Sequence, residues 1–554
     1  MSEDTSMLAE QPQAQAPRAS KSSIRKTDEF KMQPCSWSFH LFFWGFVALL
    51  RAAVGYQPHS GQDNYHGSLE KGAYGGDFEA QRHWMELTIN LPVGDWYWYE
   101  TGYWGLDYPP LTAYVSWICG WASYYIVGPE SVALDLSRGI EDLNHKSFMR
   151  ATVLVLDLLI YGRAVWYATY EGDRKSLWTI LIALCQPAIL LIDHGHFQYN
   201  TVALGLSISA FSQMVKINFS SCVWGGFFFA MALNFKQMTL YYAPVVFFYL
   251  LGRCTAGSRW RWFFPRILWL GGVVLLTFCV LWEPFVKYPP SNQTPIPNQL
   301  ERLEHVVRRI FPFERGLFEG KVANLWCALN TSPLNIRDRI PTETQPLLAM
   351  FMTSVLMFPS CWKVLNVGLD DPSSVVTVRR HWVFMLWATT SCALSFFLAS
   401  FQVHEKSILL AVGPCTLLFW EDPVFVEWFS LVSVWTLYPL FRVDRLQVAY
   451  WCVVVIFASM VWFRHISMGQ KKIDTIFSDT SMLRKIPYLS YVGMIGLHAA
   501  QALIPTPSNL PDLYEVLWSV AGCGMFSIAW LATIIKLYYS SSSGPPTILK
   551  TKGD

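Results

Sequence analysis

Acidic residues are concentrated in residues 56–110, which hold eight Asp and Glu residues against two basic ones. Within this segment, Asp77 follows two glycines and opens a stretch whose apolar residues recur at helical spacing. A carboxylate in a partly dry site lined by aromatic rings can accept a proton from a hydroxyl group. An Asp at such a position can equally cap the helix, and the spacing of Asp77 and Glu79 also matches a pair of metal ligands. General base, helix cap and metal ligand are all open interpretations of Asp77.

Other polar residues of this segment are candidates for substrate binding. Glu79 and Arg82 lie on the polar face of the predicted helix, opposite its apolar face. Asp107 lies in the Pro-containing turn before the next apolar run. It is either a turn-forming residue or a second carboxylate of the pocket.

A second polar segment, residues 285–345, is basic and aromatic in its middle. Such a stretch is suited to holding a phosphate near a carboxylate, although attraction to lipid headgroups, about 1 kcal/mol per basic residue, would also explain some of the charges. A third group of ionisable residues lies in a short turn between two apolar runs, where such groups are candidates for a functional site. The residues of these two groups are His305, Arg308, Arg309, Arg315 and Lys321, and His404, Glu405 and Lys406.

The segment Asp193–Asn200, with the sequence DHGHFQYN, resembles a metal site. Two His and an Asp in a turn between spans serve more often as hydrogen-bonding caps. The predicted topology places this segment on the cytosolic side, away from the two large polar loops, so the sequence assigns it no catalytic role.

The composition indicates a membrane protein. Of 554 residues, 53% are hydrophobic, 16% aromatic and 15% charged, whereas soluble domains carry about 25% charged residues. The net charge of +2 gives no reason to expect nucleic acid as a partner. The twelve cysteines form no C-x-x-C pair and no Cys/His spacing typical of zinc sites. Soluble multidomain enzymes, disordered proteins and nucleic-acid binders are all poor fits.

Apolar runs of about 20 residues predict about fourteen membrane spans. This count treats residues 222–250 as one bent helix. The candidate spans lie near residues 37–55, 111–128, 149–167, 176–193, 200–216, 222–250, 265–284, 346–363, 382–402, 407–420, 424–441, 446–463, 486–504 and 513–537.

These spans divide the chain into a disordered cytosolic tail (1–36), an N-terminal transmembrane module (37–284), a loop (285–345), a C-terminal transmembrane module (346–537) and a cytosolic tail (538–554). With the N-terminal tail in the cytosol, the basic loops, including Arg138, Lys146 and Arg150, fall on the cytosolic side. The loops 56–110 and 285–345 then lie on the other side. Three possible glycosylation sequons lie there too, at Asn218, Asn292 and Asn330.

Five segments in this order resemble the endoplasmic-reticulum dolichyl-phosphate-glucose-dependent α-1,3-glucosyltransferases. The similarity runs from about residue 37 to residue 537 and is greatest to the members that add the first glucose to lipid-linked Man9GlcNAc2. The segments are Tyr74–Glu86 (YGGDFEAQRHWME), Trp104–Pro110 (WGLDYPP), Asp193–Asn200 (DHGHFQYN), Arg309–Glu319 (RIFPFERGLFE) and Phe401–Lys406 (FQVHEK).

The resemblance implies an all-α polytopic membrane protein with the GT-C glycosyltransferase fold, helices in its luminal loops, and an active site on the luminal face of the endoplasmic reticulum membrane. The donor would be dolichyl-phosphate-glucose and the acceptor lipid-linked Man9GlcNAc2, with inversion at glucose C1 and no metal or other cofactor. The family's catalytic Asp falls on Asp77. His404 is then the first choice for stabilising the departing phosphate, followed by Arg308, Arg309, Lys321 and Lys406.

Three other functions are weighed against this one. The sister enzyme that adds the second α-1,3 glucose shares the layout but differs around the first-loop Asp and at Gly195. A transporter would show two related halves with charges near the membrane midplane, and no internal repeat is visible. A glycosidase would need two carboxylates across the scissile bond, for which Asp77 and Asp107 would be the pair.

Overall fold

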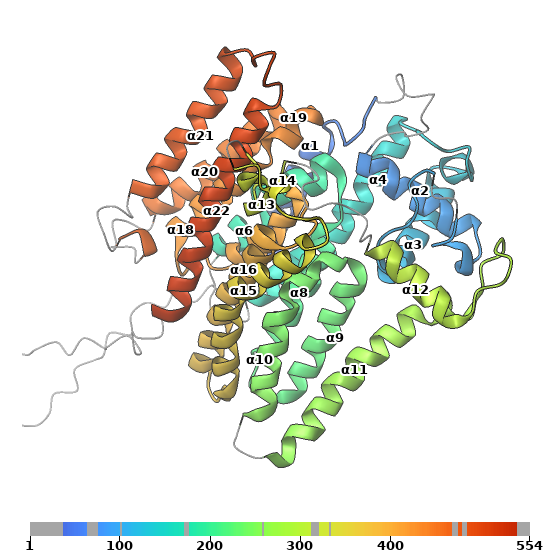
Figure 1. Ribbon diagram of the computed structural model, residues 1–554, viewed down its shortest axis with the longest axis horizontal. Helices are drawn as coiled ribbons and strands as arrows, with labels where there is room; N and C mark the ends of the chain where they lie inside the picture. Colours follow the sequence, from blue (N-terminus) through green and yellow to red (C-terminus); the bar gives the residue numbers. More distant parts are fainter. Residues whose placement is uncertain are drawn as a thin grey trace, which may run out of the picture.

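The computed structural model describes residues 37–63, 76–99, 102–170, 177–256, 260–311, 321–331, 334–467, 475–478 and 485–539. Within these residues every regular element is helical (Figure 1). The predicted tails lie outside them, apart from residues 538–539, and so does Arg315.

In the N-terminal half, α1 is followed by α2 in the acidic segment, by α3, which starts at the last residue of that segment, and then, among the described residues, by eight helices of four to 28 residues. Short π-helical stretches join α4 to α5 (Asp157–Gly162) and extend α7 (Leu191–Phe197). The helices are α1 Trp37–Gly55, α2 Gly76–Asn90, α3 Pro110–Ile126, α4 Leu143–Leu156, α5 Arg163–Tyr170, α6 Leu177–Leu184, α7 Pro187–Leu190, α8 Asn200–Met214, α9 Phe219–Phe235, α10 Ala243–Thr255 and α11 Trp260–Lys287.

The C-terminal half begins with three helices of the second polar segment and continues with long apolar helices. A capping box of Asn298 and Glu301 starts α12, and Asp422 caps α18 ahead of Pro423. The helices are α12 Gln299–Ile310, α13 Leu325–Leu329, α14 Ile336–Arg339, α15 Gln345–Leu369, α16 Val375–Ala399, α17 Leu409–Thr416, α18 Pro423–Thr436, α19 Tyr438–Val443, α20 Gln447–Ser467, α21 Lys485–Leu503 and α22 Leu513–Tyr539.

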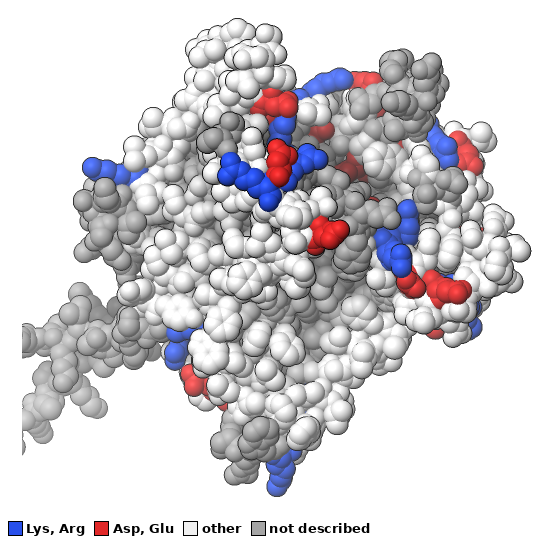
Figure 2. Space-filling view, viewed as in Figure 1, with Lys and Arg blue, Asp and Glu red and all other residues white. Residues whose placement is uncertain are grey.

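Seven helices of the described part are long and apolar enough to cross a membrane. On the face seen in Figure 2, broad areas over the long helices carry no charged side chain, and the charged side chains gather in small clusters of both signs. The prediction of an all-α polytopic membrane protein is therefore confirmed. The seven are Trp37–Gly55, Leu177–Phe197, Arg261–Lys287, Gln345–Leu369, Val375–Ala399, Gln447–Ser467 and Leu513–Tyr539.

The predicted span at residues 111–128 is wrong. These residues form α3, which packs along α2 and is not among the helices that are long and apolar enough to cross. The close approach depends on Gly120, where a Cβ atom would come within 2.7 Å of the Met85 carbonyl oxygen. Because α2 and α3 pack together, we place both in the large loop between α1 and α4.

The predicted bent helix at residues 222–250 is in fact two helices. Helix α9 ends at Phe235, Lys236 has an extended backbone (φ −145°, ψ 117°), and a 3-10 turn leads into α10. At the end of α10, Arg253 donates a hydrogen bond to the carbonyl of Met214, at the end of α8, over 3.0 Å. Helix α10 therefore returns to the end of the bundle at which α9 began. The first correction removes one predicted span and the second adds one, so the number of spans stays the same. The loops between α3 and the break at Lys236, however, move to the other end of the bundle.

The reversal moves several predicted features to the other end of the bundle. We call the end at which α2 lies the α2 end, and the end at which α10 stops and α11 starts the opposite end (Figure 1). Lys146 lies at the α2 end, where its Nζ atom donates to Gln62 Oε1 over 3.0 Å, and Arg138 and Arg150 lie there too, at the same end as Asp77 and not across the membrane from it as predicted. Asn218 starts α9 at the opposite end, so its predicted position beside the other two sequons is also wrong.

Candidate active site

Asp77 lies in the first turn of α2, at the α2 end of the bundle. The preceding Gly76 has φ +80°, and a Cβ atom there would come within 2.4 Å of Ser60 Oγ, so only glycine fits. The backbone N–H of Asp77 donates to the same Ser60 Oγ over 3.3 Å. The Asp77 side chain remains 24% exposed, so the turn presents this carboxylate to a partly open site.

Three side chains from distant segments lie within hydrogen-bond distance of one oxygen of the Asp77 carboxylate, Oδ2. His196 Nε2 lies 2.8 Å away, and Lys406 Nζ, 2.5 Å away, and the Gln198 amide donate hydrogen bonds to this oxygen. The carboxylate is thus bound by groups of other segments, which favours a chemical role over the capping interpretation.

Lys406 and Asp77 set each other's ionisation. Burial alone would raise the pKa of Asp77, but the charges of Lys406 and His196 outweigh it and hold that pKa well below its ordinary value. Burial would lower the pKa of Lys406, and the charge of Asp77, followed by that of Glu405, raises it instead. At neutral pH the pair is therefore a carboxylate and an ammonium ion.

His196 is held between two carboxylates. Its Nδ1 atom lies 2.5 Å from Asp444 Oδ2, while its Nε2 atom faces Asp77. Asp444 is 5% exposed and lies in the turn between α19 and α20. The imidazole ring is therefore oriented from both sides, as a histidine that handles a proton or fixes a neighbour must be.

The backbone next to His196 is strained. Phe197 is fully buried and has φ +89°, a conformation that residues with a Cβ atom rarely adopt. It ends the π-helical stretch Leu191–Phe197, and such stretches occur often at functional sites. The strain lets the two polar side chains on either side of Phe197, His196 and Gln198, reach the same oxygen of Asp77.

A buried polar layer lies behind Gln198. Lys236 Nζ donates to Gln198 Oε1 over 3.2 Å and to Asn200 Oδ1 over 2.5 Å. The Asn200 amide donates in turn to Asp193 Oδ1 over 2.7 Å. The break between α9 and α10 thus delivers a lysine to the site, which explains why the apolar run is interrupted there.

A second buried layer fixes the segment that carries His196. Asp157 accepts a hydrogen bond from Arg51 Nε over 2.7 Å and lies 2.7 Å from His194 Nε2, and all three side chains are at most 3% exposed. Arg150 donates to the backbone carbonyls of His194 and Gly195. The predicted position of Asp193–Asn200, away from the large loops, is therefore wrong, because this segment forms the floor of the Asp77 site.

Glu79 and Arg82 lie elsewhere on α2. The Arg82 guanidinium bonds both Glu79 carboxylate oxygens, at 2.6 and 2.8 Å, and lies 2.6 Å from Glu86 Oε2. Ser137, in the segment before α4, also accepts from Arg82 over 2.5 Å. These buried charges tie α2 to the rest of its loop, which is a structural arrangement.

The metal interpretation of Asp77 and Glu79 has no support in this geometry. The Asp77 carboxylate faces His196 and Lys406, whereas the Glu79 carboxylate faces Arg82 and Tyr103. Among the described residues, no three His, Cys, Asp or Glu side chains come together in a way that could hold a metal ion.

The other predicted site residues are scattered over the α2 end. Asp107 and Arg309 are both half-buried. Burial lowers the pKa of Arg309, and the nearby charge of Asp107 opposes this decrease. Arg308 is exposed on α12, 2.6 Å from Glu304. Lys321 pairs with Asp512 and Glu515 near α22, and His404 is exposed two residues before Lys406.

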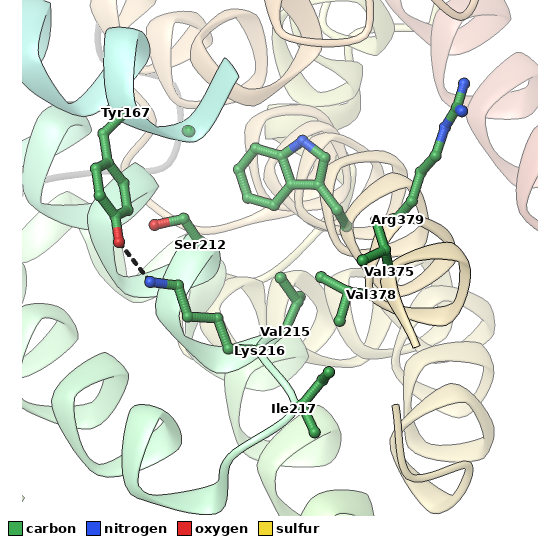
Figure 3. A pocket seen from close by; sticks show the side chains of 10 residues that line it. Tyr167, Ser212, Val215, Lys216, Ile217, Val375, Val378 and Arg379 are labelled. Carbon is green, nitrogen blue, oxygen red and sulfur yellow. Dashed lines mark hydrogen bonds between the residues drawn. The ribbon is translucent and has the colours of Figure 1, made fainter. Parts of the chain in front are cut away.

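Cavities occur at both ends of the described bundle. One of about 400 Å³ lies between α1 and α4, beside Lys146, Arg150 and His194. Another, of about 310 Å³, lies beside Glu405. The third, of about 200 Å³, lies at the opposite end (Figure 3), where Lys216 donates a hydrogen bond to Tyr167. The first two are at the end that carries Asp77, and so is a small void of about 10 Å³ between Lys236 and Lys406.

Sequence reasoning missed Lys236, Asp444 and the site role of His196 and Gln198. The signal for the last two was visible as a dense polar motif within an apolar stretch, but the reversed topology hid it. Lys236 was visible as a charge inside a predicted span, which by default marks a functional residue. Asp444 is a single acidic residue in a short turn and gave no signal.

Comparisons with known proteins agree with the resemblance. A family model described as the ALG6, ALG8 glycosyltransferase family matches residues 48–532. A probable dolichyl pyrophosphate Man9GlcNAc2 α-1,3-glucosyltransferase of Schizosaccharomyces pombe is 38% identical over 480 residues, which cover 84% of this chain and 87% of the relative. The dolichyl pyrophosphate Man9GlcNAc2 α-1,3-glucosyltransferases of Mus musculus and Saccharomyces cerevisiae are 36% and 34% identical, over 85% and 90% of this chain and 92% and 91% of their own lengths.

Proposed function

Because this chain belongs to the ALG6, ALG8 glycosyltransferase family, we propose that it transfers the first glucose from dolichyl-phosphate-glucose to lipid-linked Man9GlcNAc2, in α-1,3 linkage. The names of the relatives supply the acceptor and the linkage. The single observation that carries the mechanism is the Asp77 carboxylate, partly exposed and held by His196, Gln198 and Lys406.

The reaction is a single displacement. The proton of the mannose 3-hydroxyl passes to Asp77 while the oxygen attacks glucose C1. The bond between C1 and the phosphate oxygen breaks, and its electron pair leaves with dolichyl phosphate. A β-linked donor gives an α-linked product in one such step, so one base suffices and no covalent intermediate forms.

Lys406 acts both on the base that takes the proton and on the phosphate that departs. In the resting site its ammonium group neutralises Asp77. When Asp77 takes the proton, that attraction ends, and the cation is available to the negative charge that develops on the departing phosphate. His404 and Arg309 are further candidates for the phosphate.

His196 and Asp444 act on the base. A low pKa makes Asp77 a weak base, so its position must compensate for its low proton affinity. The hydrogen bonds from His196 and Gln198 fix one carboxylate oxygen, Oδ2, and leave the other, Oδ1, for the incoming hydroxyl. Such pre-organisation reduces the cost of reaching the reactive geometry.

We place the site on the luminal side of the endoplasmic reticulum membrane. The opposite end of the bundle carries basic residues in the short connections between helices, where the rule on positive charge applies, and this fits the cytosolic side. These residues include Lys216, Arg253, Arg266 and Arg379.

Purified protein with dolichyl-phosphate-glucose tests this proposal directly. We expect transfer to Man9GlcNAc2 on dolichyl pyrophosphate and little transfer to the same acceptor carrying one glucose. Preference for the glucosylated acceptor would identify the sister activity, which adds the second glucose. Absence of transfer to both acceptors would overturn the proposal.

A further inference from the structure

The cavity of about 310 Å³ at the α2 end lies beside the Asp77 site, between the start of α13, the turn before α17, α19 and the first turns of α22. Two residues of its wall adjoin site residues in the chain. Glu405 precedes Lys406, which contacts Asp77, and Val443 precedes Asp444, which holds His196. The cavity and the site are therefore built on two shared segments, the turn before α17 and the turn after α19.

The charges of the cavity do not suit a phosphate. Lys321 is its one basic residue, and its Nζ atom lies 2.6 Å from Asp512 and 2.5 Å from Glu515. Glu405 adds a further carboxylate to the wall. Carboxylates thus outnumber ammonium groups, and the potential of the cavity repels anions.

The same groups suit a neutral, polyhydroxylated ligand. Carboxylates accept hydrogen bonds from hydroxyl groups, and the lysine ammonium donates them. The side chains of Lys321, Asp512 and Glu515 are 36%, 60% and 45% exposed, so a ligand can reach them. The other side of the cavity is apolar, with Pro439, Leu440 and Val443, and such a surface can pack against the C–H faces of sugar rings.

We propose that this cavity binds the glycan arm of the acceptor, at the sugars that adjoin the mannose to be glucosylated. This inference rests on the proposed function, because it takes the acceptor from it. It assigns Lys321 to the sugar, whereas the sequence suggested the donor phosphate for this residue. It also assigns a substrate contact to Glu405, which belongs to one of the sequence motifs, and to Glu515, which no sequence motif singled out.

A bulky residue at the wall of the cavity tests the proposal without disturbing the core. Val443 is 78% exposed and lines the cavity, so Val443→Trp adds a ring that occupies it. Val448, at the start of α20, is 70% exposed and does not line the cavity, so Val448→Trp is the matched control. We expect the acceptor KM of Val443→Trp to rise about tenfold or more, with the donor KM unchanged and both values normal in the control.

Measuring kcat and the acceptor KM separately distinguishes blocked acceptor binding from an indirect effect on the Asp77 site. If Val443→Trp acted by displacing Asp444, kcat would fall and the acceptor KM would stay the same, which would count against the cavity. Glu515→Gln provides a second variant with little change in shape, and Glu304→Gln, an exposed acid paired with Arg308 on α12, is its control. We expect Glu515→Gln to raise the acceptor KM about tenfold.

Two results would overturn the inference. One is an acceptor KM unchanged in both Val443→Trp and Glu515→Gln, and the other is a rise in the donor KM instead. Failure of the proposed function looks different, because the unmodified protein would then transfer no glucose to Man9GlcNAc2.

Discussion

Asp77 and Lys406 are 329 residues apart in the chain, and their side chains meet at 2.5 Å. Asp77 comes from the first loop helix, and Lys406 from the turn between α16 and α17. Each therefore depends on the other half of the chain for its partner. Because the pair lowers the pKa of Asp77, the carboxylate is ionised throughout the neutral range and loses its charge only well below it.

The pH dependence of transfer reports this pair. Lys406→Met removes the largest favourable influence on the Asp77 carboxylate and leaves burial, which raises its pKa. The acid limb of kcat/KM should therefore move to higher pH, within a scan from about pH 5 to 8, and kcat should fall. Arg308→Met, on an exposed residue of α12, should leave the profile unchanged. An acid limb at the same pH in Lys406→Met and the unmodified protein would exclude this electrostatic role.

Asp444 is expected to position His196 without contacting the substrate. Asp444→Asn keeps the shape of the side chain and removes the carboxylate charge that orients the imidazole ring. We expect kcat to fall by about 10²-fold, with both KM values nearly unchanged and partial recovery in Asp444→Glu. A steady-state comparison of these variants checks the prediction, and a normal kcat in Asp444→Asn would show that the contact is dispensable.

The buried pair of Arg51 and Asp157 is expected to matter for stability. Asp157→Asn leaves the fully buried guanidinium of Arg51 without its counter-charge, which should lower the free energy of unfolding by about 3–5 kcal/mol. Asp63→Asn, which breaks the exposed pair with Arg445, should cost less than about 1 kcal/mol. Thermal unfolding of both variants in detergent decides the matter, and equal midpoints would refute the difference.

Transfer should not depend on a divalent cation. Asp77 and Glu79 bind different partners, and Lys406 already supplies a positive charge next to Asp77. Treatment with a chelator should leave the rate unchanged. A rate that falls on chelation and returns with a divalent ion would restore the metal interpretation of the two carboxylates.

Much of the fold could be predicted from local properties of the sequence. Helix α1 has the predicted bounds, 37–55, because a mostly apolar run of this length forms a helix when it spans a membrane. The helix that begins near Asp77 was also predicted, from the glycines and the apolar spacing that follows them. Both features are set by residues close together in the chain.

The convergence of the site residues could not be predicted in the same way. An apolar run such as α3 can cross a membrane or pack on a neighbouring helix, and only its contacts with α2 show which it does. The break at Lys236 depends on Gln198 and Asn200, which bind its ammonium group. The error at α3 reversed the side of the loops that followed it, so His196 and Asp77 were predicted on opposite sides of the membrane, and the error at Lys236 reversed the later loops back again.

Glucose transfer by Asp77→Asn tests the central claim most directly. The substitution keeps the size of the side chain and removes the base, so we expect transfer to fall by about 10²- to 10⁴-fold, with an unchanged elution profile in size-exclusion chromatography. Asp63→Asn, which alters an exposed acid of the same loop, should retain full activity. Normal transfer by Asp77→Asn would contradict the account, because no carboxylate at this position would then be needed to take the proton.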